Sequence, residues 1–208
     1  MRLNVQYGCG LSEPEQWINF DASPTLRLQR LPVIGEMFKK VEFPKDVQYG
    51  DIVKRLPGIK PNTCDAIYCS HVLEHLSLND FKTALKNTFT LLKPGGIFRC
   101  VLPDLEQIIN QYINDRKNDI PTASILFMRN TLLGVENRPA GIKSNIINMF
   151  GNFHHLWMWD KYSLREELLN CGFQTIRECN FGDSANADFT FVEDPSRFVG
   201  AIAFEAIK

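Results

Sequence analysis

The chain has 208 residues, of which 44% are hydrophobic and 11% aromatic, and its formal charge is −1. A chain of this length and composition can form one substantial core, so we expect a single domain over residues 1–208. Basic and acidic residues are interleaved without a basic stripe, which argues against a nucleic-acid partner. No apolar run approaches the roughly 20 residues that span a bilayer, and the N-terminus lacks a signal-peptide pattern. We therefore expect a soluble, cytoplasmic protein with no membrane partner.

The first two predicted strands enclose a glycine turn. Alternating apolar and polar residues predict a short strand over residues 3–7, and residues 17–20 predict a second strand that ends at Asp21. Between them, Gly8 and Gly10 let the backbone turn sharply and approach a ligand without an intervening Cβ. A carboxylate at the next strand end can accept two hydrogen bonds from a ribose diol, so the two features together predict a nucleotide-like ligand.

The connection between these two strands is short. Only nine residues, Gly8 to Gln16, separate them, whereas a helical crossover between parallel strands usually takes a dozen or more. We therefore expect the first helix to be reduced to a turn or absent. The short connection also argues against a nicotinamide dehydrogenase, because a pyrophosphate binds at the N-terminus of a full helix that follows the glycine turn.

Helices and strands alternate in the middle of the chain. Residues 24–40 carry leucines at positions 26, 28 and 31 and are interrupted by Pro32, which predicts a broken helix or a wrapped loop. Residues 47–51 and 65–70 predict the third and fourth strands. Residues 79–92 predict the clearest helix, since apolar residues recur there at spacings of three and four before a Pro-Gly-Gly sequence.

The remaining elements continue this alternation and end in two strands. Residues 97–102 predict a buried strand, and residues 105–116 and 160–170 predict helices. Residues 174–179 and 198–207 predict two last strands that form an edge hairpin.

An insertion is predicted over residues 121–159. Residues 130–152 are rich in Asn and Gly and only weakly periodic, as an inserted loop or lid would be. We expect this insertion to lie over the bound ligand and its motion to gate turnover.

Each of the first five predicted strands ends in polar residues or in the glycine turn. These ends are Tyr7 and Gly8, Asp21, Asp51, Ser70 and His71, and Asp104. Strands that alternate with helices at this spacing predict an α/β sheet with mostly parallel strands, whose ligand lies at the carboxyl ends of the strands. Because five consecutive strand ends carry such residues, the sequence predicts one ligand-binding site along this edge of the sheet.

The six cysteines form no Cys-x-x-Cys pair and no paired clusters. They stand at positions 9, 64, 69, 100, 171 and 179, several of them within apolar runs. Free cysteine packs as a small hydrophobic residue, so we expect reduced, buried thiols rather than a zinc site or disulfides.

Several short motifs follow one another in a characteristic order. They are residues 3–10, residues 17–21, Asp51 with Leu56-Pro57, His71-Val72-Leu73-Glu74-His75-Leu76, Leu91-Leu92-Lys93-Pro94-Gly95-Gly96, Val101-Leu102-Pro103-Asp104 and, near the end, Leu168 to Phe173. In this combination the chain resembles the class I S-adenosylmethionine-dependent methyltransferases, in particular the small members of type 11.

The resemblance implies a Rossmann-like class I methyltransferase fold, with a mostly parallel seven-stranded sheet and an antiparallel C-terminal edge hairpin. It also implies S-adenosylmethionine as the cofactor, with Gly8 and Gly10 against its methionine part, Asp21 on its ribose and Asp51 near its adenine amine. The full set of cofactor-binding residues that it implies is Tyr7, Gly8, Cys9, Gly10, Asp21, Asp51, Ser70 and His71.

Two positions depart from the family pattern. Gln6 replaces the usual acid two residues before the first glycine, and Ser12 replaces the third glycine. In the family pattern these two positions concern the contacts to the amino group of the cofactor, so both substitutions would change those contacts. Together with the missing first helix, they leave open a non-catalytic module that keeps the nucleotide-binding fold but has lost affinity for the cofactor.

A second alternative arises because residues 71–75 also spell H-x-x-E-H, the inverted zinc-protease motif. In that motif two histidines four apart on a helix bind the metal, and the glutamate activates water. A zinc-dependent hydrolase using His71, Glu74 and His75 is the weaker hypothesis, because the motif here directly follows a strand and ends at Ser77. We expect Glu74 and His75 to hold the loop through hydrogen bonds to neighbouring backbone, and we expect no metal.

Candidate catalytic residues follow the insertion. Adjacent side chains of an extended segment point in opposite directions, so at most one of His154 and His155 faces the cleft, and His155 is the preferred general base with His154 second. Asp104, Trp157 and Tyr162 are the candidate acceptor contacts, although Asp104 also suits the cap of the helix that follows it. We therefore expect methyl transfer to an oxygen or nitrogen of a small-molecule or saccharide acceptor.

Overall fold

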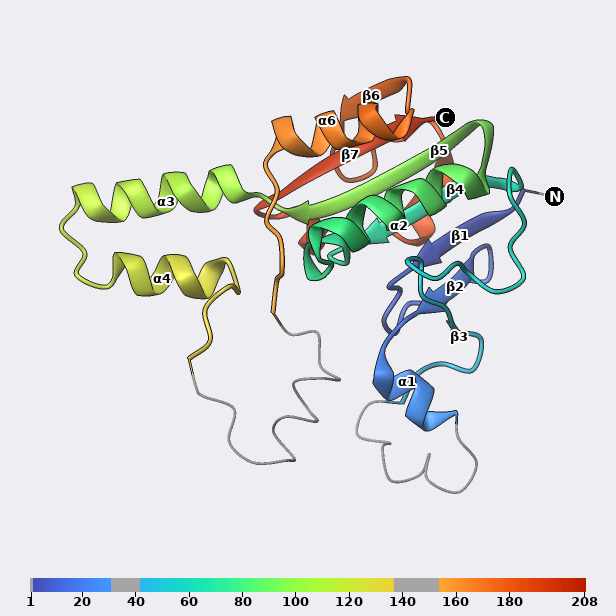
Figure 1. Ribbon diagram of the computed structural model, residues 1–208, viewed down its shortest axis with the longest axis horizontal. Coiled ribbons are helices and arrows are strands. Elements are labelled where there is room, and N and C mark those ends of the chain that lie inside the picture. The colour runs from blue at the N-terminus through green and yellow to red at the C-terminus, as the bar shows by residue number, and fades with distance from the viewer. Residues whose placement is uncertain (1, 31–41, 137–153) are drawn as a thin grey trace.

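A seven-stranded sheet in the order β3-β2-β1-β4-β5-β7-β6 forms the centre of the molecule (Figure 1). The computed structural model describes residues 2–30, 42–136 and 154–208. Its strands are β1 Asn4–Tyr7, β2 Ile18–Asp21, β3 Gln48–Tyr49, β4 Cys64–Ser70, β5 Leu92–Pro103, β6 Thr175–Glu178 and β7 Ala201–Ile207. The first five strands run parallel, whereas β7 lies antiparallel between β5 and β6. The structure therefore confirms the predicted α/β class and the antiparallel C-terminal pair.

The helices are close to those predicted from periodicity and capping. They are α1 Pro24–Gln29, α2 Leu78–Leu91, α3 Leu105–Lys117, α4 Ala123–Asn130 and α6 Lys161–Cys171, with short 3₁₀ helices η2 Leu73–His75, η3 Ala187–Phe191 and η4 Pro195–Phe198. The predicted bounds of α2, α3 and α6 were each correct to within one residue. The predicted broken helix over residues 24–40 is represented by α1, and residues 31–41 lie outside the described residues.

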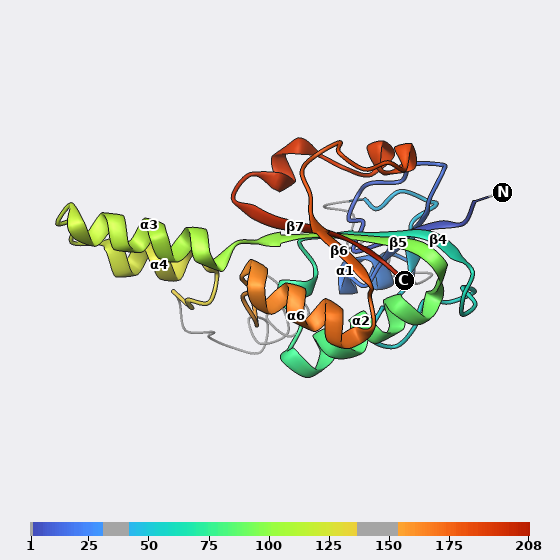
Figure 2. The ribbon, with the colours of Figure 1, turned by 90° about the horizontal axis from the view of Figure 1, so that it is seen from above.

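One face of the sheet carries the main apolar core. Because side chains alternate along a strand, Val5, Phe20, Ile67, Phe98 and Phe204 project to the same side. There they pack against α2 and α6, which lie side by side beneath the sheet in Figure 2. This core sets the positions of the strand ends.

The opposite face is covered by residues 179–200, which form the strap of chain between β6 and β7 (Figure 2). This cover contains only the short helices η3 and η4, so many of its backbone carbonyls accept no hydrogen bond from within a helix. Side chains of the sheet supply donors instead: Trp17 Nε1 bonds to Asp188 O at 3.0 Å, and Arg99 Nη2 bonds to Asn180 O at 2.8 Å. Polar residues on this face of the strands thus hold an irregular layer in place.

Arg99 is the centre of an ion cluster on this face. Its side chain is completely buried, and it donates to Glu193 Oε1 at 2.6 Å, to Glu205 Oε2 at 2.9 Å and to Asp183 Oδ1 at 3.0 Å. Arg177 binds Glu205 and Asp183 from the more exposed side. Three carboxylates and two guanidinium groups therefore join β5, β6, β7 and the strap.

The connection from β1 to β2 contains no helix, as its length predicts. Gln6 explains how the chain manages without one. Its Nε2 atom donates to Ser12 O at 3.3 Å and to the Oδ1 atom of Asn19, whose own Nδ2 atom donates to Pro14 O at 3.2 Å. Gln6, which departs from the family pattern, therefore has a structural role in fixing this loop.

The helices α3 and α4 form an arm that projects beyond the end of the sheet (Figures 1 and 2). They pack on each other through Tyr112 and Phe127, whose ring centroids are 5.5 Å apart. The sequence analysis did not predict α4 within the insertion over residues 121–159. Residues 137–153 of the predicted lid lie outside the described residues.

All six cysteines are free thiols. Four of them are buried as predicted, whereas Cys9 and Cys171 are only half-buried. None of the helices within the described ranges is long and apolar enough to cross a membrane.

The N-terminus of α6 is fixed by Asp160. Its carboxylate accepts hydrogen bonds from Ser163 N at 2.7 Å and Ser163 Oγ at 2.8 Å, and the backbone bond above all lowers its pKa. Replacing Asp160 with Ala is expected to lower the free energy of unfolding by about 1 kcal/mol, the usual contribution of a capping side chain. Urea denaturation measures this, with Glu166→Ala on the exposed face of α6 as the control. Equal effects of the two changes would contradict the role of the cap.

Candidate functional site at the carboxyl edge

The glycine turn after β1 packs directly against the segment that follows β4. Gly8 has φ +66° and Gly10 has φ +58°, which is the left-handed region that favours glycine. A Cβ atom built on Gly8 would lie 2.2 Å from Val72 Cγ2, whereas one built on Gly10 would meet no atom of the described residues within 4 Å. Gly8 is therefore required for contact between two loops, and Gly10 for the backbone conformation alone.

Asp21 holds the glycine turn through its carboxylate. Its Oδ2 atom accepts a hydrogen bond from Gly10 N at 2.9 Å, and its Oδ1 atom accepts one from Ser23 N at 2.7 Å. The side chain is mostly buried, and burial raises its pKa despite these bonds. Each carboxylate oxygen has a further lone pair, so Asp21 could also accept hydrogen bonds from a ribose.

Tyr7 and Cys9 contribute to this edge only in part. The Tyr7 ring is buried in the core, with its hydroxyl 3.2 Å from Thr88 Oγ1, so its backbone alone lies at the edge. The half-buried Cys9 Sγ lies 3.6 Å from Gly10 O, and burial raises the pKa of this thiol to about 12. Cys9 is thus a neutral thiol and not a nucleophile.

Asp51 and Ser70 lie beside this turn, just after β3 and at the end of β4. Asp51 begins the turn after β3, where its carboxylate accepts from Val53 N at 3.0 Å and lies 3.3 Å from Lys54 Nζ. The preceding residue, Gly50, donates its N–H to Asp21 O at 3.1 Å, so Asp51 and Asp21 lie on neighbouring strand ends. Ser70 is the last residue of β4. The structure therefore brings the predicted cofactor residues to one edge.

Glu74 is the most unusual group at this edge. Its side chain is 1% exposed, and burial raises its pKa to about 8. Three imidazoles face its Oε1 atom: the Nδ1 atom of His71 at 3.5 Å, and the Nε2 atoms of His75 and His155 at 3.9 Å each. Neither oxygen accepts a hydrogen bond from any other residue that the structure describes. The predicted bonds from the Glu74 side chain to neighbouring backbone were therefore wrong.

His71 and His75 do not form the helical pair of the inverted zinc-protease motif. His71 has φ +54°, and the helix η2 that follows it has only three residues. The outer nitrogen of each ring is held by a backbone carbonyl, since His71 Nε2 lies 2.9 Å from Arg197 O and His75 Nδ1 lies 3.1 Å from His154 O. The predicted role of His75 in holding its loop is confirmed.

The two candidate bases occupy different surroundings, as expected for adjacent residues. His154 is exposed, with its Nδ1 atom 3.3 Å from Leu132 O. His155 is 6% exposed and contacts Met158 Sδ through its Nδ1 atom at 3.2 Å, and burial lowers its pKa to about 4. His155 is consequently a neutral imidazole at pH 7.

The predicted acceptor residues lie around the same edge. Asp104 caps α3, because its carboxylate accepts from Glu106 N at 2.9 Å, and it forms a β-bridge with Trp159. The side chains of Trp157 and Tyr162 are 42% and 69% exposed and available to a ligand. Trp159, in contrast, is buried and stacks on Phe81 in the core.

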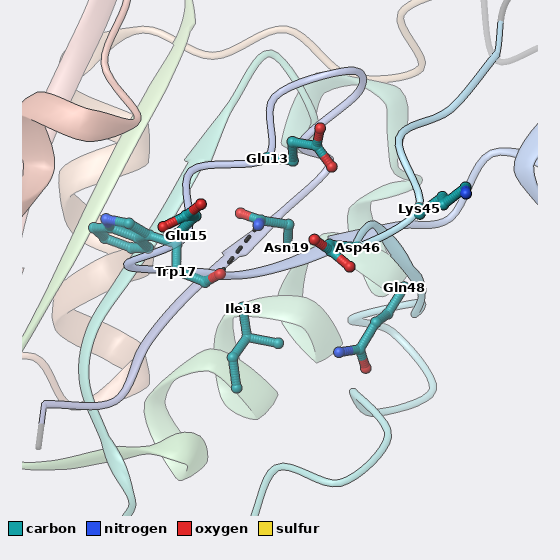
Figure 3. Close-up of a pocket in the computed structure, with 8 residues that line it drawn as sticks. All are labelled: Glu13, Glu15, Trp17, Ile18, Asn19, Lys45, Asp46 and Gln48. Carbon is teal, nitrogen blue, oxygen red and sulfur yellow. Dashed lines mark hydrogen bonds between the residues drawn. The ribbon is translucent and has the colours of Figure 1, made fainter.

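A pocket of about 490 Å³ lies elsewhere, at the start of β2 and β3 (Figure 3). It is lined by Glu13, Glu15, Trp17, Ile18, Asn19, Lys45, Asp46 and Gln48. These residues precede the carboxyl ends of their strands, and none belongs to the predicted site. This pocket therefore plays no part in the proposed site.

Sequence reasoning missed the position of Glu74 at the centre of the three imidazoles. The signal available was the Glu-His pair at positions 74 and 75 together with a second histidine pair at 154 and 155. Only the fold brings these two segments into contact, through hydrogen bonds from Leu156 N and Trp157 N to Glu74 O at 2.7 Å and 3.1 Å.

Residues 7–100, which contain the glycine turn, Asp21 and the Glu74 segment, match the family model of a methyltransferase domain. This part of the chain is therefore similar to a methyltransferase domain. The match confirms the enzyme class and, with it, S-adenosylmethionine as the cofactor implied by the sequence resemblance. No protein with curated annotation matches the sequence.

Solved structures share the fold of this methyltransferase domain at low sequence identity. A SAM-dependent methyltransferase from Archaeoglobus fulgidus is 15% identical with a TM-score of 0.52, and the match covers 100% of this chain and 86% of that one. A SAM-dependent methyltransferase from Thermotoga maritima is 14% identical with a TM-score of 0.53, and that match covers 100% and 83% of the two chains. The fold is thus the Rossmann-like fold of these enzymes.

Proposed function

We propose that the protein transfers a methyl group from S-adenosylmethionine to an oxygen or nitrogen atom of a small-molecule or glycan-type acceptor. The methionine part of the cofactor lies against Gly8 and Gly10, and the ribose binds Asp21. The observation that carries this proposal is the hydrogen bond from Gly10 N to the Asp21 carboxylate, because it joins the glycine turn and the acid into one unit at the carboxyl edge.

The remaining cofactor contacts follow from the neighbouring strand ends. Asp51 lies next to Asp21 and binds the adenine amine, and Ser70 and His71 flank the cofactor from the end of β4. Tyr7 contributes through its backbone, since its side chain belongs to the core.

Methyl transfer itself is an in-line displacement. A lone pair of the acceptor attacks the sulfonium methyl, a new C–O or C–N bond forms as the S–CH₃ bond breaks, and S-adenosylhomocysteine leaves as a neutral thioether. The proton of an acceptor hydroxyl passes to a base. The protein mainly aligns the two reactants and excludes water.

His155, or His154 in its place, is the proposed base, and Asp104, Trp157 and Tyr162 contact the acceptor. The neutral state of His155 supports this role, because only neutral imidazole accepts a proton. The insertion over residues 121–159 covers the acceptor. Its C-terminal end already rests on the binding edge through the two hydrogen bonds to Glu74 O.

Calorimetric titration with S-adenosylhomocysteine tests the proposal. We expect about micromolar binding to the wild-type protein and weakening of about 100-fold in Asp21→Ala, since one buried carboxylate that accepts two hydrogen bonds is lost. Asp21→Asn is the matched variant, because its amide oxygen can keep one of these bonds, and it should bind with intermediate affinity.

NAD serves as the competing ligand in the same experiment. Absence of S-adenosylhomocysteine binding, or equal binding of NAD, would contradict the proposal. Circular dichroism of each variant establishes that the fold is retained, so that a lost affinity reports on the site.

A further inference from the structure

All four histidines of the chain gather at one place in the fold. They belong to two segments, His71 with His75 and His154 with His155, that are far apart in the sequence and in contact in the structure. The rings of His75 and His155 pack edge to face, with centroids 4.9 Å apart. Glu74, almost completely buried, points its carboxylate between them.

Hydrogen bonds on the outer side of the cluster fix the tautomers of the two facing rings. His75 Nδ1 lies 3.1 Å from His154 O, and His155 Nδ1 lies 3.2 Å from Met158 Sδ. A carbonyl oxygen and a thioether sulfur only accept hydrogen bonds, so each Nδ1 atom carries the proton. In the neutral form of each ring the Nε2 atom then has a free lone pair, and both Nε2 atoms lie 3.9 Å from Glu74 Oε1.

The inner side of the cluster is consequently lined by acceptors. Within the described residues, no other side chain or backbone group donates a hydrogen bond to either oxygen of Glu74. The exposed side chain of Arg197 donates no hydrogen bond to Glu74 in the described structure. A buried carboxylate that faces imidazole lone pairs is unfavourable unless a positive charge lies between them.

A proton alone satisfies this arrangement poorly. One proton on Glu74 can bond to a single imidazole and leaves the other lone pairs without a partner. A proton on the Nε2 atom of His75 or His155 would not form a normal hydrogen bond with Glu74, because each nitrogen lies 3.9 Å from Oε1. A metal ion can accept electron pairs from all of the facing donors at once.

We propose that Glu74, His75 and His155 bind a divalent transition-metal ion of the zinc class. One donor atom from each residue lies within 4.8 Å of the other two. Donors that share a tetrahedral zinc ion at about 2.0–2.2 Å lie about 3.3–3.6 Å apart. The two distances of 3.9 Å from Glu74 Oε1 must therefore shorten by roughly half an ångström, and the largest donor separation, which is within 4.8 Å, by at most about 1.5 Å. Two imidazole nitrogens and one carboxylate oxygen form a common ligand set for catalytic zinc, and they leave a fourth position open. The contacts of the two Nδ1 atoms hold the rings in an orientation in which their Nε2 atoms can bind the ion.

The position of the ion suggests its use, and this step rests on the proposed function. The cluster follows β4 at the edge where the methyl group is transferred, and Val72 of the same segment touches the glycine turn. With the ion bound, the metal replaces His155 as the group that activates the acceptor, because the Nε2 lone pair of His155 is then held by the metal. An acceptor hydroxyl bound at the fourth position would lose its proton to water more readily, since a bound cation lowers the pKa of such a group. The resulting oxygen lone pair would then attack the sulfonium methyl.

Titration of the full chain with zinc, after removal of bound metal with a chelator, tests the site. We expect one ion per chain with a dissociation constant at or below about micromolar. His75→Ala, His155→Ala and Glu74→Gln should each weaken binding by at least about 100-fold. His154→Ala is the matched control, because its backbone carbonyl and not its ring bonds to His75, and it should bind zinc as the wild type does. Cobalt in place of zinc should give the visible absorption of a four-coordinate ion.

Glu74→Gln keeps the test decisive if a histidine variant fails to fold, since it preserves the shape of the side chain and removes only its charge. Stoichiometric zinc binding that is unchanged in Glu74→Gln, or no binding by the wild type, would overturn the site. S-adenosylhomocysteine is titrated into the same samples. Binding of S-adenosylhomocysteine without zinc overturns the metal site alone, whereas zinc binding without S-adenosylhomocysteine supports the metal site and overturns the methyl-transfer proposal.

Discussion

Replacing Arg99 with Met is expected to lower the free energy of unfolding by about 3–5 kcal/mol, the typical cost of removing one partner from a buried ion pair. The Arg99 side chain is 0% exposed, as is that of Glu193, which it binds at 2.6 Å. Met has a similar length but no charge, so the carboxylates of Glu193 and Glu205 would lose their buried cation. Urea denaturation followed by circular dichroism measures the change.

Arg177→Met provides the comparison for Arg99→Met. The side chain of Arg177 is 40% exposed, and its partners Glu205 and Asp183 would keep their bonds to Arg99. We expect a loss below about 1 kcal/mol, as for other exposed ion pairs. Equal destabilisation by the two substitutions would show that the buried ion pair contributes no more to the free energy of unfolding than the exposed one.

The same ion cluster gives the stability a pH dependence that Arg99→Met should weaken. Burial raises the pKa of Asp183, but hydrogen bonds from Arg177, Asn180 and Arg99 outweigh it and lower the pKa to about 2. A carboxyl group whose pKa is lower in the folded state stabilises that state above its unfolded pKa of about 3.8. This stabilisation is lost as the pH falls from about 4 toward 2, and the loss should be smaller in the variant.

Replacing Gly8 with Ala is expected to weaken the binding of S-adenosylhomocysteine by at least about 100-fold. The new Cβ would lie 2.2 Å from Val72 Cγ2, closer than any van der Waals contact allows, and the φ of +66° is itself unfavourable for alanine. Either the glycine turn or the segment after β4 must therefore move. Both are proposed to contact the cofactor, and calorimetric titration measures the loss.

Gly10→Ala is the comparison that distinguishes the steric clash in Gly8→Ala from the strain of an alanine with a positive φ. Gly10 has a similar φ of +58°, but its added Cβ would meet no described atom within 4 Å. We expect at most about a tenfold loss of affinity, since a left-handed alanine costs roughly 1–2 kcal/mol and part of this cost is shared by the free protein. Val72→Ala combined with Gly8→Ala removes the clashing methyl group and should recover part of the affinity. Equal losses in the two glycine variants, without recovery in the double variant, would contradict this account.

The elements predicted best are those whose ends are encoded locally. Ser77 and Asp160 accept hydrogen bonds from the first turns of α2 and α6, and Gly172 ends α6 with a φ of +113°. The Pro-Gly-Gly sequence at residues 94–96 follows the end of α2 at Leu91, as predicted, but it also lies within β5. Gly95 N donates to Lys208 O at 2.8 Å, and Lys208 N donates to Gly96 O at 3.1 Å. The local sequence does not contain this pairing with the end of the chain, so the predicted strand began five residues late.

Other features depend on contacts that no local pattern reveals. The helix α4 receives no side-chain cap from Thr122 and packs mainly on α3, so its sequence carried no start signal. The buried Arg99 cluster joins residues from strands and strap that are far apart in sequence. The cofactor residues could be predicted because each stands at the end of a strand. The approach of His155 to Glu74 could not be predicted, because it occurs only when the end of the insertion folds back against the edge of the sheet.

The contact between Gly8 and Val72 has a thermodynamic consequence. The two loops touch without room for one additional carbon atom, so a ligand that pushes one loop toward the other must displace both. Linkage is reciprocal: the factor by which a ligand near Glu74 changes the affinity for the cofactor equals the factor by which the cofactor changes the affinity for that ligand. The packing of one valine on one glycine can therefore make the release of the spent cofactor depend on what is bound at the neighbouring loop.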